Sequence, residues 1–177
     1  MLRFRLASQH LLLTREALAN FRGLRELGLF AQLFPQTEAL LGDQRMLKLL
    51  ESALEGTAAR IEAEQPVSPA FLYATLLWAP VAQRAAELEA TQGYPPSVAL
   101  TQAADGVLAQ QVMRVAIPKR FSGPAREIWL MQPRFAFRRG KRPARLMAHP
   151  RFRAAYDFLC LRAATGEADQ ELADWWT

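Results

Sequence analysis

The sequence predicts an all-α fold: a compact bundle of amphipathic helices with a basic, Pro- and Gly-rich C-terminal arm. Three observations lead to this prediction. Apolar residues recur at intervals of three and four along most of the chain, which is the spacing of one helix face. No stretch of useful length alternates apolar and polar residues as a strand does, and no repeat of fixed period occurs. Over 177 residues, a composition that is 51% hydrophobic is sufficient to bury a core.

The first two helices are defined by their apolar spacing and by the residues at their ends. The first carries a stripe at three-residue spacing, formed by Leu18, Phe21, Leu24 and Leu27. Gly28 follows this stripe and is a typical helix stop, because glycine adopts the left-handed conformation at low cost. A second, longer helix is expected from Asp43 to Glu64, with Asp43 as its N-cap and Pro66 beyond its end.

The middle of the chain predicts a central core helix and two helices after it. The stretch "SPAFLYATLLWAP" places Ser68 as the N-cap and Pro69 at the first helical position, and it stays apolar on most faces as far as Pro80. A further helix is expected from Pro80 to about Gln92. The glycine and prolines of "GYPPS" predict a turn, and another helix should then run towards Val115.

Short helices are predicted after Pro118, over "SGPAREIWLMQ", "PARLM", "HPRFRAAYDFLCLRAATG" and "DQELADWW". Between Pro118 and Pro150 these elements are separated by prolines and glycines, so none of them buries much apolar surface by itself. We therefore expect the stable core in the helices before Val115. The basic arm should lie against these helices or be partly mobile until something binds to it.

Positive charge is concentrated in one part of the chain. The whole sequence has a net charge of +5, but residues 111–153 contain 12 Lys and Arg against one Asp or Glu. Residues 1–110 are nearly balanced, and residues 154–177 are acidic. Such a one-signed run repels itself unless an anion relieves it. The sequence therefore predicts a polyanionic partner for the basic segment, the alternative being a solubilising surface.

The sequence lacks the residues that several kinds of catalytic and metal site require. The chain has two histidines and one cysteine, which excludes zinc-ligand spacing and a Cys-His pair. No glycine-rich phosphate loop or serine elbow is present, and the carboxylates are scattered singly. Cys160 is expected to be a small buried hydrophobe. The lack of a disulfide suits the cytoplasm, and we expect neither a secretory signal nor a membrane span.

The basic segment combines guanidinium groups with aromatic rings. Its cations Arg134, Arg138, Arg139, Lys141, Arg142 and Arg145 are interleaved with Phe135 and Phe137. Arginine grips phosphate through two hydrogen bonds, and unstacked bases rest on flat rings. This combination favours single-stranded RNA over duplex DNA, with little sequence preference. Anchoring of the arm to the core is an equally good explanation of the two phenylalanines.

From about Leu12 to Thr177 the sequence resembles the C-terminal half of the bacterial poly(A) polymerase I family. The stretches that carry the resemblance include "ELGLFAQLFPQTEALL", "VSPAFLYATLLWAPV", "VAIPKRFSGPAREIWLMQPR" and "RRGKRPARLMAHPRFRAAYDFLCLRA". The resemblance implies a helical neck over 1–65 and a helical body with an arginine-rich region over 66–177. It also implies that Lys119 and Arg120 join the other cations in holding RNA.

In that family a nucleotidyltransferase head adds AMP from ATP to RNA 3′ ends, using Mg²⁺ held by carboxylates. The sequence contains no Gly-Ser turn followed by an Asp-x-Asp pair, and "MLRFRLASQH" departs from the family pattern. The chain alone is therefore predicted to be inactive and to need no cofactor. Its expected partners are single-stranded RNA 3′ ends and a separate head. Two alternatives are a scaffold that docks an RNA helicase or RNA-decay protein, and the body of a tRNA nucleotidyltransferase.

Overall fold

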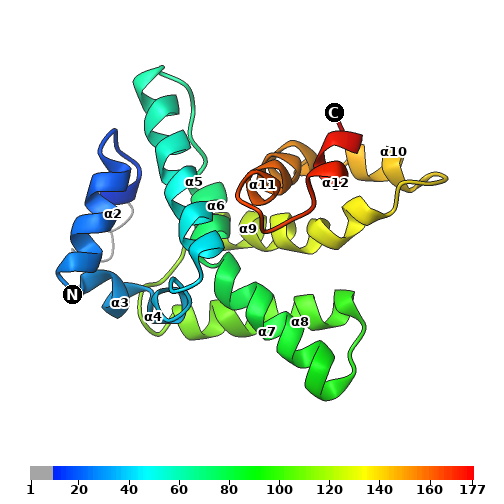
Figure 1. Ribbon diagram of the computed structural model, residues 1–177, viewed down its shortest axis with the longest axis horizontal. Helices are drawn as coiled ribbons and strands as arrows, with labels where there is room; N and C mark the ends of the chain where they lie inside the picture. Colours follow the sequence, from blue (N-terminus) through cyan, green and yellow to red (C-terminus); the bar gives the residue numbers. More distant parts are fainter. Residues whose placement is uncertain (1–9) are drawn as a thin grey trace.

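The computed structural model describes residues 10–177, and every regular element in this range is helical (Figure 1). Most of the divergent N-terminal stretch, residues 1–9, lies outside the described residues. The elements are α2 (Ala17–Glu26), α3 (Leu29–Leu33), α4 (Pro35–Glu38), α5 (Gln44–Glu62), α6 (Pro69–Leu76), α7 (Trp78–Gln92), α8 (Pro96–Gln111), α9 (Lys119–Met131), the 3₁₀ helix η1 (Gln132–Ala136), α10 (Arg142–Met147), α11 (Phe152–Ala164) and α12 (Gln170–Trp175). The predicted all-α class is confirmed.

The helix ends follow the predicted capping residues. The Asp43 carboxylate accepts a hydrogen bond from the Arg45 backbone N–H at 2.9 Å, at the start of α5. The Ser68 hydroxyl accepts one from the Phe71 N–H at 3.2 Å and so begins α6. Gly28 has a φ of +69° and reverses the chain after α2. These caps satisfy backbone N–H groups that have no partner inside the helix.

Two predicted helix boundaries are wrong, and both errors concern prolines. The helix break expected at Pro80 lies at Leu77. Pro80 is in the first turn of α7, where backbone N–H groups have no partner inside the helix, so its missing N–H costs no hydrogen bond. Helix α9 begins at Lys119 and continues through Pro124.

The predicted apolar stripe of the first helix is one residue too long. Leu27, its last member, is 74% exposed because α2 has already ended at that residue.

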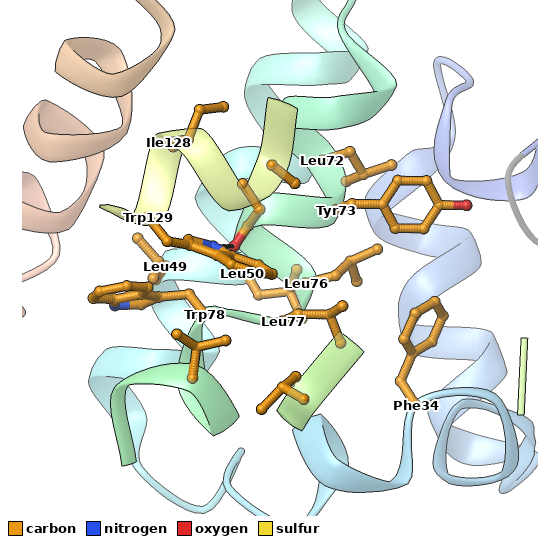
Figure 2. Packing of buried hydrophobic residues seen from close by; sticks show 14 of the residues in the cluster. Phe34, Leu49, Leu50, Leu72, Tyr73, Leu76, Leu77, Trp78, Ile128 and Trp129 are labelled. Atoms are coloured by element: carbon orange, nitrogen blue, oxygen red, sulfur yellow. Dashed lines mark hydrogen bonds between the residues drawn. The ribbon is translucent and has the colours of Figure 1, made fainter. Parts of the chain in front are cut away.

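A central cluster of buried hydrophobic side chains joins α2–α9 and α11. Its large, fully buried members are Leu12, Phe21, Phe30, Leu49, Leu50, Leu54, Leu76, Leu77, Ile128, Trp129 and Phe158. Figure 2 shows Trp129 of α9 among Leu49, Leu50 and Trp78. The indole N–H of Trp129 donates to the Ala74 carbonyl of α6 at 2.9 Å. The core therefore extends beyond Val115, contrary to prediction, because the apolar face of α9 packs on α6.

A smaller C-terminal cluster anchors the basic arm. It is formed by Met131, Phe135, Leu146, Ala155, Leu159, Ala163 and Ala173, which come from α9, η1, α10, α11 and α12. The end of the arm thus lies against α11, a helix after Val115, whereas its first helix, α9, packs on α6 as expected. Cys160, predicted to be buried, is only half-buried at the edge of this cluster.

A largely buried polar network connects the two clusters. Arg162 of α11 forms an ion pair with Glu167, and their side chains are 14% and 10% exposed. The same carboxylate accepts a hydrogen bond from the Trp78 indole N–H at 3.0 Å. Arg162 also donates to the Gln132 side chain at 2.9 Å, and its guanidinium lies 4.4 Å from the centre of a Trp78 ring. Residues of α7, η1 and α11 are therefore held in one arrangement.

Candidate nucleic-acid interface

The most basic part of the chain forms an exposed turn between η1 and α10. This arginine turn, residues 137–142, reverses at Gly140, whose φ of +69° favours glycine. Figure 1 shows the turn as a loop at the edge of the molecule, between the end of α9 and α10. An open depression at the turn is lined by Ala136, Phe137, Arg138, Arg139 and Arg142. The turn therefore presents guanidinium groups around a concave surface.

The two phenylalanines beside the turn have different roles. Phe135 is fully buried, and the rings of Phe152, Tyr156 and Trp176 lie between 5.3 and 6.4 Å from its ring. It is therefore an anchor, and base stacking on this ring is excluded in the folded chain. Phe137 is 48% exposed, and the Arg142 guanidinium lies 4.6 Å from its ring centre. Its exposed area is available for a ligand.

The predicted RNA-binding cations fall into two groups. Arg134 in η1, Arg145 in α10 and the four cations of the arginine turn lie around one end of the molecule, and all except the half-buried Arg138 are exposed. Lys119 and Arg120 are at the start of α9. This helix has 13 residues, so they lie about 20 Å from its far end. The structure therefore does not gather all the predicted residues into a single site.

The predicted RNA-binding cations differ from the other arginines in how few ion pairs they form. In the described range, 10–177, Arg138 is the only predicted RNA-binding cation within 4 Å of a carboxylate, at 3.8 Å from Glu171. By contrast, Arg25 donates three hydrogen bonds of 2.8–3.2 Å to the Glu38 carboxylate. The hydrogen bond to Glu38 is the main reason why the pKa of Arg25 is raised. The cations near the arginine turn thus keep N–H donors for another anion.

Sequence reasoning missed the contribution of α12 to this surface. Glu171 approaches Arg138, and the Trp176 indole N–H donates to the Phe135 carbonyl at 3.0 Å. Trp175, the neighbouring residue, is 46% exposed. The acidic balance of residues 154–177 and the Trp pair were visible in the sequence. Their position beside the basic turn was not, because it depends on how α12 packs.

The described residues contain neither a cluster of metal ligands nor a membrane-spanning helix. Among residues 10–177, no group of three or more His, Cys, Asp or Glu side chains is placed to hold a metal ion. The Mg²⁺ and ATP that the sequence resemblance implies for the parent reaction thus find no carboxylate clamp here, and we assign no step of that reaction to the described residues. In the same range, no helix is both long and apolar enough to cross a membrane.

Comparisons with known proteins agree with the arginine-rich character of this region. A family model described as "Polymerase A arginine-rich C-terminus" matches residues 92–177. Proteins named poly(A) polymerase I from Salmonella typhi, Escherichia coli O6:H1 and Haemophilus influenzae are 38%, 37% and 34% identical to 89%, 89% and 96% of the chain. The chain spans only 35–38% of the length of these curated relatives.

Proposed function

We propose that the chain, whose residues 92–177 match the arginine-rich C-terminal part of the polymerase A family, holds single-stranded RNA at the arginine turn. The RNA phosphates bind Arg138, Arg139, Lys141 and Arg142. Arg134 and Arg145 extend the basic surface on either side. Lys119 and Arg120 bind the same strand at the other end of α9. The parent reaction is template-independent addition of AMP to RNA 3′ ends by a nucleotidyltransferase head, and this chain positions the RNA.

The scarcity of carboxylate partners at the arginine turn, where only Arg138 approaches one among residues 10–177, is the observation that carries this proposal. Arg126, in α9, by contrast donates hydrogen bonds to the Asp105 carboxylate at 2.6 and 3.1 Å. Arg139, Lys141 and Arg142 make no ion pair in the described residues. Bound phosphates reduce the electrostatic repulsion among these cations, and this relief adds to the free energy of binding.

The test replaces Arg138, Arg139, Lys141 and Arg142 with alanine and measures RNA affinity by fluorescence anisotropy at several salt concentrations. Each lost phosphate contact removes roughly 0.7 from the slope of log affinity against log salt for single strands, so four contacts give about 2.8. Unrelated sequences should weaken by similar factors, because phosphates are common to all of them.

The matched control removes the same charge elsewhere, by replacing the exposed Arg15, Arg22, Arg45 and Lys48 with alanine. These residues lie in or next to α2 and α5. Circular dichroism checks that both variants fold. If the control flattens the salt slope as much as the turn variant does, or if the turn variant keeps its slope, phosphate binding at the arginine turn is refuted.

A second measurement addresses the chemistry. The purified chain, incubated with a labelled oligoribonucleotide, ATP and Mg²⁺, should not extend the RNA, because the clustered carboxylates that hold two metals are missing from the described residues. Extension by the purified chain would refute the assignment of a purely RNA-holding role.

A further inference from the structure

Helix α12 is fixed against the base of the arginine turn. Its start is capped by the Asp169 carboxylate, which accepts a hydrogen bond from the Glu171 N–H at 3.0 Å. Near its end, Trp176 packs edge-on against the Phe135 ring, with centroids 5.3 Å apart, and donates to the Phe135 carbonyl. Phe135 is two residues before the turn. The surface of α12 and the arginine turn are therefore held in a fixed relation.

Trp175 lies on this surface with nearly half of its area exposed. Trp78 and Trp129 are at most 4% exposed, whereas Trp175 is 46% exposed. Its ring meets that of Trp176 edge-to-face, with the ring centroids 4.8 Å apart. Glu171 precedes it by four residues on the same helix face and contacts Arg138 at 3.8 Å. An exposed indole is thus placed about one helical turn from the Glu171–Arg138 pair.

The charges around Trp175 determine which part of a nucleic acid it meets. Asp174 and Glu171 are exposed on the same short helix, and both repel phosphate. These carboxylates do not repel a neutral base, and stacking of the base on an exposed aromatic ring is favourable. The cations of the arginine turn are next to this helix and attract the phosphates. The geometry therefore places a cationic surface beside an acidic helix that carries an exposed ring.

We propose that Trp175 is a stacking surface for an unpaired base of the RNA whose phosphates bind the arginine turn. This inference rests on the proposed function and adds a residue that the basic sequence motif does not contain. Phe137, the residue before Arg138 in the sequence, has a second exposed ring. Stacking on an aromatic face tolerates every base, so the site adds affinity without sequence preference.

The experiment compares two ligands of equal phosphate number: a labelled single-stranded oligoribonucleotide and an abasic oligomer. Trp175→Ala should weaken oligoribonucleotide binding at least about fivefold, as expected for one lost stacked base. It should leave the salt slope and the affinity for the abasic oligomer unchanged. Trp175→Phe should retain most of the affinity, because it keeps an aromatic face. Oligoribonucleotide binding should also quench indole fluorescence in the unmodified chain and much less in Trp175→Phe.

The control is Leu27→Ala, which removes a more exposed apolar side chain at the end of α2. Helix α2 lies on the opposite side of the molecule from α12 (Figure 1). Near-ultraviolet circular dichroism verifies that Trp176 keeps its packing in Trp175→Ala. Unchanged oligoribonucleotide affinity in Trp175→Ala overturns the inference while phosphate binding at the arginine turn stands. Equal losses for both ligands also overturn it, because they mean that Trp175 only positions the turn. If the unmodified chain binds neither ligand, the proposed function fails together with the inference.

Discussion

The central cluster and the C-terminal cluster both pack against α9, but they leave different groups at the surface. The central cluster closes around Trp129, and the arginines on the helices that build it are mostly paired, as in Arg25–Glu38 and Arg126–Asp105. The C-terminal cluster is small and centred on Phe135. The arginines on or beside α11 are paired with carboxylates, but of the four cations in the arginine turn only Arg138 approaches one in the part of the chain that the structure describes, at 3.8 Å from Glu171. The difference is that most arginines on the helices of the core are paired, whereas three of the four cations in the arginine turn have no carboxylate partner among the described residues.

The comparison also explains why the basic turn needs an anchor. Exposed cations that repel one another contribute little to folding, so a segment rich in them needs apolar contacts to keep its conformation. Phe135 supplies these contacts from within the basic segment itself. The C-terminal cluster therefore holds the turn in place, and the central cluster supplies most of the stability.

The largest expected effect is that of Trp129→Ala in the central cluster. The substitution removes a fully buried indole and its hydrogen bond to Ala74, and we expect a loss of about 3–5 kcal/mol in the free energy of unfolding. Denaturant unfolding followed by circular dichroism measures it. The matched control is Trp175→Ala, the same change at an exposed position, which should stay within about 0.5 kcal/mol of the unmodified chain. Equal losses would contradict the assignment of Trp129 to the core.

Phe135→Ala should lower the free energy of unfolding less than Trp129→Ala does, and its effect should be concentrated in the C-terminal cluster. We expect about 3 kcal/mol, the lower part of the range for a buried phenylalanine, because the small cluster around it is able to collapse partly. Hydrogen exchange should accelerate in η1, α10 and α12 and much less in α6. RNA affinity should fall, since the arginine turn loses its anchor. Acceleration throughout α6 and α9 would show that the two clusters open as one unit.

Arg162→Met tests the network that connects the two clusters. The change leaves the Glu167 carboxylate, 10% exposed, without its cation, and an unpaired charge at such a site costs about 2 kcal/mol. Thermal and denaturant unfolding measure the loss. The double variant Arg162→Met, Glu167→Gln removes both charges and should recover most of the stability. If the double variant is as unstable as the single one, packing of Arg162 on Trp78 rather than its charge provides the stabilisation.

The smallest expected effect is an increase. Glu171→Gln removes the carboxylate that competes with phosphate for Arg138, and RNA affinity should rise about two- to threefold at low salt, because an exposed pair is weak and screened. Fluorescence anisotropy measures the change, with Glu26→Gln as a control that alters the same charge on α2. A fall in affinity would mean that Glu171 orients Arg138 towards the RNA instead of competing with it.

Local patterns in the sequence predicted much of this structure. The helices at Asp43 and Ser68 begin where their caps predict, because capping depends on residues that are two or three positions apart. The positive charge of residues 111–153 is likewise a property of composition. The RNA-binding role of its cations stays a prediction, as does the division of the chain at residue 65.

The sequence by itself determined the all-α class, most helix ends and the basic segment. Only the tertiary structure decided that Phe135 is an anchor while Phe137 is exposed, and that Glu171 and Trp175 lie beside the arginine turn. It also decided that α9 completes the central cluster through Trp129. The physical reason is range: caps and helical spacing act within one or two turns. Burial and charge pairing, by contrast, depend on contacts such as that of Trp129 with Ala74, 55 residues apart in sequence.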